Sequence, residues 1–272
     1  MKRILKNVIV LFLLAGLFSC TDSSTDNVIS DAPAKDTLFT SIQKTKFTGV
    51  YDTLEYTLLV NSISKEQYKS IGTSFSENDS LIRDSICKTR EDGCMEAVEN
   101  YYIAKVSDKV KRTDGTLTIS LSNGKTIAMT NTKSDDDSYE VYQFISLDQN
   151  GYFIVATYYM ESYAYLLINS VNGKKISTVG YPVFSLDKKQ YVAGNYDMMA
   201  SFTFNGIDFM TTTSDSIISN AKIDFTTWGP DEVKWKDDST LYVKQKSQLI
   251  GELKEEYNYA AIRIRKKSRR LN

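Results

Sequence analysis

Between Val141 and Asp197 the chain alternates short apolar runs with tight-turn sequences, and this pattern constrains the fold more than any other feature. Runs of roughly four to eight residues rich in Val, Ile, Tyr and Phe are typical of strands. Ser-Leu-Asp separates the runs at 146–148 and again at 185–187, and Asn172-Gly173 predicts a hairpin. We therefore expect antiparallel strands through this part of the chain.

The apolar composition supports the same conclusion. The 272 residues include 18 Tyr and 12 Phe, and aromatic side chains fit the pleated, half-buried surface of a sheet. We expect regular strands from Tyr101 onward, with a type I′ hairpin about Asn123-Gly124 and another hairpin about Asn205-Gly206. Short helices are expected only at 64–72 and 76–88. The sequence thus predicts an all-β fold of repeated antiparallel strands, with one or two short helices near the N-terminus.

Part of the strand region repeats. Residues 146–156 align with 185–194 at an offset of 39 residues, and 233–244 is a looser third copy. A period of roughly 40–50 residues with several short strands is typical of a β-propeller blade. The segment NSVNGKKISTVGYPVFSLDKKQYVAG (169–194) resembles the repeats of TolB- and WD40-like propellers. This resemblance implies a small propeller-like domain over residues 38–265, and a β-sandwich is the competing fold, because alternating strands and tight turns serve both.

The N-terminus has the composition of an export signal. Three basic residues precede an apolar run from Val8 to Phe18, and Ser19-Cys20 ends it. These eleven residues are too few to span a bilayer of about 30 Å, so residues 1–19 are expected to form a signal peptide. Leu17-Phe18-Ser19-Cys20 resembles the signal of a bacterial lipoprotein, which implies cleavage before Cys20 and a lipid on its thiol. An ordinary signal peptide with an incidental cysteine is the alternative.

Residues 20–37 are rich in Ser, Thr and Asp and contain no aromatic residue. Such a composition cannot bury a core, and it predicts a flexible tether. The acidic residues behind Cys20 resemble the surface-export signals of Bacteroidetes-type lipoproteins. The resemblance implies a protein of the cell envelope that is anchored by lipid to the outer membrane and faces the periplasm or the cell surface.

Two further cysteines, Cys87 and Cys94, have six residues between them. In an exported protein such a pair most simply forms a disulfide. Together with residues 228–244, the pair is similar to a group of uncharacterised bacterial exported proteins. The chain contains no histidine, which excludes Ser-His-Asp and Cys-His catalysis and every zinc site that needs imidazole. We expect no catalytic residue, metal or cofactor, although catalysis by carboxylates, Lys or Tyr stays open.

Charge argues against nucleic acid as a partner. Removal of residues 1–19 takes away three of the 33 basic residues and none of the 34 acidic ones, so the mature chain is acidic. No positive field attracts a phosphate backbone. The basic tail, 266–272, either solubilises the terminus or contacts anionic lipid headgroups.

Three tyrosines, Tyr158, Tyr159 and Tyr163, are candidate ligand-binding aromatics. Exposed, they can stack on sugar rings or hold a peptide, whereas alternation along a strand turns about half of such residues into the core. Asp148 and Glu161 are the acids nearest to them and would be the carboxylate pair of a glycan hydrolase. Asp135-Asp136-Asp137 is interpreted as a solvated turn in preference to a calcium site.

The sequence supports three functional hypotheses. The first is a lipid-anchored, exported binding or scaffolding module of the cell envelope, held to the membrane through Cys20 and binding a protein or glycan partner. The second is a carboxylate-based glycan hydrolase. The third is a structural envelope component without a ligand. The lack of histidine favours the binding module.

Overall fold

A computed structural model describes residues 49–52, 56–88, 90, 92–213, 216–248 and 255–267. The expected signal peptide (1–19), the tether (20–37) with Cys20, and the tail beyond Lys267 lie outside the described residues. Strands account for 50% and helices for 14% of the described residues. The fold is therefore mostly β, built from antiparallel sheets, as the sequence predicts.

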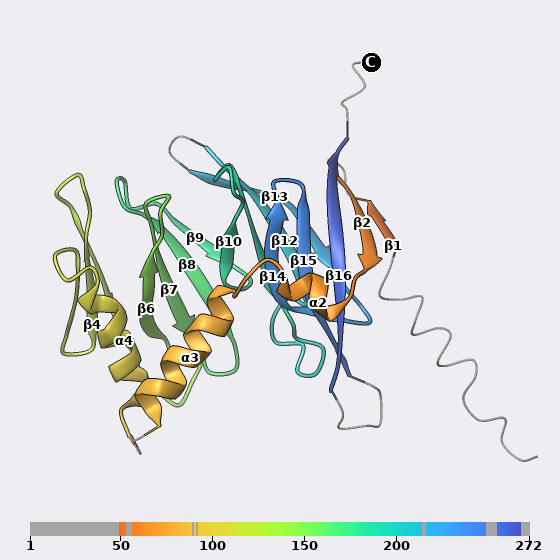
Figure 1. The fold of residues 1–272 in the computed structure, drawn as a ribbon. Helices are drawn as coiled ribbons and strands as arrows, with labels where there is room; N and C mark the ends of the chain where they lie inside the picture. The colour runs from red at the N-terminus through yellow and green to blue at the C-terminus, as the bar shows by residue number, and fades with distance from the viewer. Residues whose placement is uncertain are drawn as a thin grey trace, which may run out of the picture. The chain divides into compact units, whose positions relative to one another are not determined.

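Four sheets follow one another along the chain (Figure 1). The first comprises β3 (Val110–Thr113), β4 (Thr116–Ser120) and β5 (Thr126–Thr130). The second comprises β6 (Val141–Leu147), β7 (Tyr152–Tyr158), β8 (Tyr163–Asn169) and β9 (Lys175–Thr178). The third comprises β10 (Pro182–Phe184), β11 (Gln190–Asn195), β12 (Gly206–Thr212) and β13 (Ile217–Asp224). In each of these sheets, strands that are consecutive in sequence pair with one another.

The fourth sheet joins the N-terminal and C-terminal parts of the described chain. Its strand order is β1 (Gly49–Asp52), β2 (Tyr56–Ser62), β16 (Glu255–Lys266), β15 (Thr240–Gln248) and β14 (Gly229–Asp237). Strand β2 pairs with β16 in antiparallel register, with Leu58 opposite Ile264 and Val60 opposite Ile262. Figure 1 shows this contact where the orange strands lie beside the blue one. We call this unit the five-stranded sheet.

Neighbouring sheets pack through separate apolar clusters. The cluster between the second and third sheets includes Ile154 and Tyr191, and that between the third sheet and the five-stranded sheet includes Val192 and Trp235. Strand β7 is buried on both faces, because Phe153 packs toward the first sheet and Ile154 toward the third. A strand that packs between two sheets has a continuous run of apolar residues in its sequence, not an alternation of apolar and polar residues.

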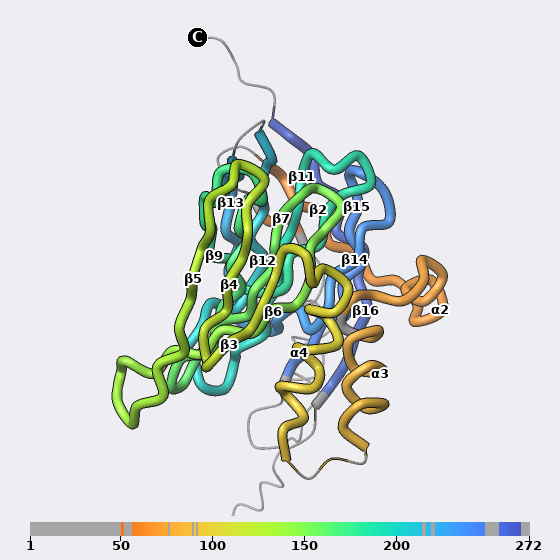
Figure 2. The backbone as a smooth tube through the Cα atoms, turned by 90° about the vertical axis from the view of Figure 1, so that its left-hand side faces the viewer, coloured from red at the N-terminus to blue at the C-terminus, as the bar shows by residue number. Residues whose placement is uncertain are grey.

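Three helices are described: α2 (Lys65–Lys69), α3 (Phe75–Cys87) and α4 (Cys94–Ala104). The Ser74 hydroxyl accepts from the Glu77 backbone N–H at 3.1 Å, and the Glu77 carboxylate accepts from the Ser74 N–H at 2.9 Å. This capping box fixes the start of α3. Figure 2 shows α3 and α4 lying side by side.

The expectation of strands from Tyr101 onward is wrong at its start, because α4 extends to Ala104. The Tyr-Tyr-Ile segment at 101–103 has high strand propensity. Tertiary packing outweighs this strand propensity. Val98 and Tyr102 are four residues apart, lie on one face of the helix and belong to the apolar cluster that also contains residues of the first and second sheets.

The hairpin expected about Asn205-Gly206 is also wrong. Gly206 begins β12 and pairs with Asn195, whereas Asn123-Gly124 and Asn172-Gly173 do lie in hairpin turns. The turn at Asn123-Gly124 is not of the expected type I′, because Gly124 has positive φ and Asn123 does not. The Asn205 side-chain amide donates to the carbonyls of Phe225 and Trp228. A Cβ at Gly206 would lie 2.0 Å from the Ile223 carbonyl oxygen, so glycine is needed here for close strand approach and not for a turn.

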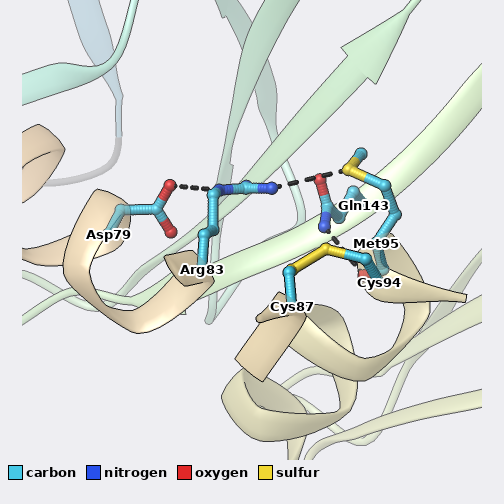
Figure 3. Close-up of a disulfide and its surroundings, with 6 residues drawn as sticks. All are labelled: Asp79, Arg83, Cys87, Cys94, Met95 and Gln143. Carbon is cyan, nitrogen blue, oxygen red and sulfur yellow. Dashed lines mark hydrogen bonds and ion pairs between the residues drawn. A yellow bond between two sulfur atoms is a disulfide. The ribbon is translucent and has the colours of Figure 1, made fainter. Parts of the chain in front are cut away.

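Cys87, the last residue of α3, is bonded to Cys94, the first residue of α4, with their Cα atoms 5.1 Å apart (Figure 3). Gly93 precedes α4 with φ of 72°, a left-handed conformation that favours glycine. Near the disulfide, Arg83 pairs with Asp79 on α3. Arg83 also donates from Nη1 to the Met95 sulfur on α4 at 3.4 Å, so this contact and the disulfide tie the two helices together.

Candidate ligand-binding cleft

A cleft of about 650 Å³ opens between the second, third and five-stranded sheets. We call it the inter-sheet cleft. Three strands line it: β6, β10 and β14. Strand β6 is the first strand of the second sheet and β10 the first of the third, whereas β14 is the first of the C-terminal strands in the five-stranded sheet. The connection from α2 to α3, at Ile71 and Thr73–Phe75, forms the remaining wall. Residues that are far apart in sequence therefore meet at one concave surface.

The repeated turns lie along one rim of this cleft. In each of the three sheets a turn connects the strand that borders the cleft to its neighbour: 148–151, 185–189 and 238–239. The first two turns contribute Asp148 and Ser185 to the cleft lining. The Asp187 backbone N–H donates to the Asp238 carboxylate at 2.9 Å, which links the second and third turns. The three sequence segments that align with one another therefore form neighbouring turns at the same end of their sheets.

The rim carboxylates stabilise the turns that hold them. Asp148 Oδ1 accepts from the backbone N–H groups of Asn150 and Tyr152 at 3.0 and 2.8 Å. Burial raises the pKa of Asp148, and these hydrogen bonds oppose that effect. In the next turn, the Lys189 N–H and the Ser185 hydroxyl donate to Asp187 and lower its pKa. Both acids therefore act as turn caps.

Aromatic rings line the inside of the cleft. Phe75 stacks on Tyr181 with ring centroids 3.7 Å apart. The Trp235 indole N–H donates to the Val183 carbonyl oxygen at 2.8 Å, which fixes the ring, and Phe184 borders the same space. Ligand sites in proteins commonly combine such apolar walls with a few polar groups at fixed positions.

A smaller cavity of about 120 Å³ lies on the other side of Phe75 and Tyr181, because these two residues border both spaces. Tyr163, a candidate from the sequence, lines this cavity and donates from its hydroxyl to the Asn195 side chain at 2.7 Å. Phe75 and Tyr181 therefore separate the inter-sheet cleft from the cavity that holds Tyr163.

The other two candidate tyrosines lie elsewhere. Tyr158 is half-buried, and its hydroxyl donates to the Gln143 side chain at 3.0 Å. Tyr159 is 38% exposed and borders neither space. The structure thus places Tyr163 at a cavity and does not gather the three tyrosines into one site.

Asp148 and Glu161 do not meet. Asp148 precedes β7 and Glu161 follows it, and β7 has seven residues. A strand of that length spans roughly 20 Å. Glycosidase carboxylates lie roughly 5–9 Å apart, so this pair does not have the geometry that hydrolysis requires.

The sequence analysis did not single out Phe75, Tyr181, Phe184 or Trp235 as ligand-binding aromatics. A usable signal was present for two of them. Phe184 directly precedes the second Ser-Leu-Asp turn, and Trp235 precedes Asp237-Asp238 in the third repeat copy. Residues just before a repeated turn face the same space when the turns share a rim. Phe75 comes from a helix, which the repeats do not include.

In the part of the chain that the structure describes, no three His, Cys, Asp or Glu side chains are grouped to hold a metal ion. Asp136 instead accepts from Ser134 and Ser138 in an exposed turn. No described helix has both the length and the apolar character to cross a membrane.

No protein-family model matches the chain, and no curated protein matches it. The functional conclusion therefore depends on the geometry of the described residues.

Proposed function

We propose that the chain is an exported, lipid-anchored binding module of the cell envelope that holds a segment of a protein or glycan partner in the inter-sheet cleft. The observation that carries the proposal is the cleft itself. Its volume of about 650 Å³ falls within the range of roughly 300–1,000 Å³ that is usual for ligand sites. Its aromatic walls and polar rim provide stacking surfaces and hydrogen-bonding groups.

We also propose that the sheets form a propeller-type arrangement in preference to a two-sheet sandwich. Four sheets in succession, three of them local meanders, support it. The repeated turns on one rim support it as well, since blades are arranged around a common centre. Strands β1 and β2 complete the last sheet, so the two ends of the described chain meet within one unit.

A binding experiment tests the proposal with two exposed apolar turn residues. Leu186 is 68% exposed and lines the inter-sheet cleft, whereas Val171 is 58% exposed in the β8–β9 turn and does not line it. The lipid-free mature chain is titrated against envelope protein fractions and a glycan panel. We expect Leu186→Glu to weaken binding at least tenfold and Val171→Glu to leave it unchanged.

The other outcomes decide between the alternatives. Equal loss of affinity in both variants, or none in either, would contradict binding in the inter-sheet cleft. No binding across both panels would favour a structural envelope component. Release of reducing sugar from a glycan would favour a carboxylate-based hydrolase.

The membrane anchor is tested separately. Cys20→Ser removes the thiol that the lipoprotein signal would modify. We expect the wild-type chain to fractionate with the outer membrane and the variant to be released in soluble form. Retention of the variant in the membrane fraction would contradict anchoring through Cys20.

A further inference from the structure

A second cleft, of about 600 Å³, lies between α2 and the five-stranded sheet. Three lysines and three tyrosines line it: Lys65, Lys69, Lys244, Tyr68, Tyr257 and Tyr259. We call it the lysine–tyrosine cleft. It shares no lining residue with the inter-sheet cleft, so a ligand bound here is independent of the function proposed above.

Strand alternation places the cleft on the outer face of the five-stranded sheet. Val233, Val243 and Ile262 belong to the apolar cluster against the third sheet. Because successive side chains point to opposite faces, Glu232 and Lys244 point away from that cluster. Helix α2 covers part of this outer face through Tyr68, whose ring lies 5.0 Å from that of Tyr259.

Cations and aromatic rings alternate across β15 and β16. Lys244 Nζ lies 4.2 Å from the centre of the Tyr257 ring and also pairs with Asp231 Oδ2 at 2.6 Å. Lys246 Nζ lies 6.0 Å from the same ring. Lys65 and Lys69 approach from α2 and are exposed. Tyr257 is itself 41% exposed. The surface therefore offers rings for stacking beside positive charge.

The cleft also holds two carboxylates. Glu77 pairs with Lys234, whose Nζ lies 3.0 Å from Glu77 Oε2 and 2.9 Å from the Gly72 carbonyl oxygen. The positive charge of Lys234 is therefore balanced by Glu77 and is not offered to a ligand. Glu232 Oε2 accepts from the Tyr68 hydroxyl at 2.5 Å.

Glu232 Oε1 is buried and, within the described part of the chain, has no hydrogen-bond partner. An unsatisfied buried acceptor costs about 1–3 kcal/mol. Glu232 borders both this cleft and the small cavity beside Tyr163. Rotation of the Glu232 carboxylate toward the cleft would let a ligand hydroxyl donate to this oxygen and would remove that cost.

We propose that the lysine–tyrosine cleft binds an acidic saccharide, of the uronic acid type. Such a ligand carries all three features that the lining requires: carboxylates for the exposed Lys65 and Lys69, ring faces for the tyrosines, and hydroxyl donors for Glu232. A phosphodiester chain or an anionic lipid surface offers fewer hydroxyl donors for Glu232 than a saccharide does.

The test uses the lipid-free mature chain and calorimetric titration with oligogalacturonate. Tyr257→Ala and Lys244→Ala each remove one part of the recognition surface, and Lys69→Glu reverses an exposed charge without touching the core. We expect each to weaken binding at least tenfold. Binding of the wild-type chain should fall as salt rises, because ion pairs contribute.

Two matched controls separate recognition from general damage. Tyr159 is 38% exposed, close to the exposure of Tyr257, and Lys236 lies over the Tyr242 ring at 5.5 Å on the same sheet. Neither lines the cleft. We expect Tyr159→Ala and Lys236→Ala to bind as the wild type does, and Leu186→Glu in the inter-sheet cleft to do the same.

Three ligands serve as comparisons: fully methyl-esterified oligogalacturonate, single-stranded RNA and vesicles containing phosphatidylglycerol. The ester should bind at least tenfold more weakly than the acid. Equal affinity for the ester, unchanged binding in the cleft variants, or no saccharide binding at all would overturn the proposal. Preferred binding of RNA or vesicles would replace the saccharide with a phosphate ligand.

Discussion

Glu232 is a buried glutamate whose pKa differs from that of an exposed carboxyl group. It is 9% exposed, and burial raises its pKa from 4.5, although the Tyr68 hydroxyl and Lys234 lower it. Glu77, in the same cleft, has a lowered pKa, because burial is outweighed by the Ser74 N–H and Lys234. Two carboxylates in one cleft thus have opposite pKa shifts. The sequence around Glu232, Gly-Pro-Asp-Glu-Val, contains no sign of this difference.

The raised pKa predicts a stability change with pH. The folded state holds the Glu232 proton more tightly than the unfolded state does, so folding takes up a proton above pH 4.5. The free energy of unfolding therefore falls as pH rises through the raised pKa. Glu232→Gln cannot titrate. We expect its stability relative to wild type to increase from pH 4.5 upward and then to level off, as measured by urea unfolding at a series of pH values.

The groups that face Glu232 remain in that comparison. They are Tyr68 on α2, Glu77 on α3, Asp231 and Lys234 on β14, and Lys244 on β15. Because these groups are the same in the wild type and in Glu232→Gln, the pH dependence of the stability difference between the two comes from Glu232 alone. A stability difference that does not change with pH would contradict a raised pKa.

Gly206 gives a second prediction at the residue scale. Because its Cβ would clash with the Ile223 carbonyl oxygen, Gly206→Ala should destabilise the fold by about 2–4 kcal/mol. Gly115 is the control: it has φ of 78° with open space around it, so Gly115→Ala should cost only about 1–2 kcal/mol of backbone strain. Chemical denaturation measures both. Equal losses would indicate that Gly206 serves the backbone conformation alone.

Gly206 also shows the limit of the sequence analysis. Local chemistry predicts the hairpins at 123–124 and 172–173, because the glycine of each Asn-Gly pair adopts the positive φ that the turn needs. The same dipeptide at 205–206 serves a contact with β13, eighteen residues further along the chain. No local pattern distinguishes the two uses. For the same reason, the aromatic residues of the inter-sheet cleft could not be grouped before the sheets were placed.

At the scale of the elements, the α3–α4 pair combines a predicted helix with one that was missed. Apolar residues on one face of 76–88 made α3 recognisable from sequence. The capping box at Ser74 and Glu77 starts the helix at Phe75, one residue before that range. Helix α4 begins at Gly93 without a side-chain cap, and its strand-forming residues conceal it. It depends on tertiary support: Glu99 accepts from the backbone N–H of Phe144 on β6 at 2.7 Å and pairs with Arg112.

The disulfide should contribute measurably to this pair. Closing a short loop of this kind stabilises the folded state by about 2–3 kcal/mol in the chain-entropy model. We expect Cys87→Ser/Cys94→Ser to lower the free energy of unfolding by that amount in urea titration. Reductant should lower wild-type stability to the same level and leave the double variant unchanged. A further loss in the reduced double variant would show that the reductant acts elsewhere.

At the scale of the whole molecule, the packing predicts uneven stability. Each sheet meets its neighbours through its own apolar cluster, so nearest-neighbour contacts dominate, as in repeat proteins. Leu58 in β2 and Leu117 in β4 are both fully buried, in clusters at opposite ends of the series of sheets. Replacing either with alanine should cost about 2–5 kcal/mol.

The two substitutions should act on different parts of the molecule. In hydrogen–deuterium exchange, Leu58→Ala should expose amides in the five-stranded sheet and the third sheet, because β2 joins β16 there. Leu117→Ala should expose amides in the first and second sheets and in α4. If both variants raised exchange equally in all four sheets, the molecule would unfold as one cooperative unit. Separate responses would instead mean that a ligand bound to the five-stranded sheet, in the lysine–tyrosine cleft, protects that sheet without stabilising the first.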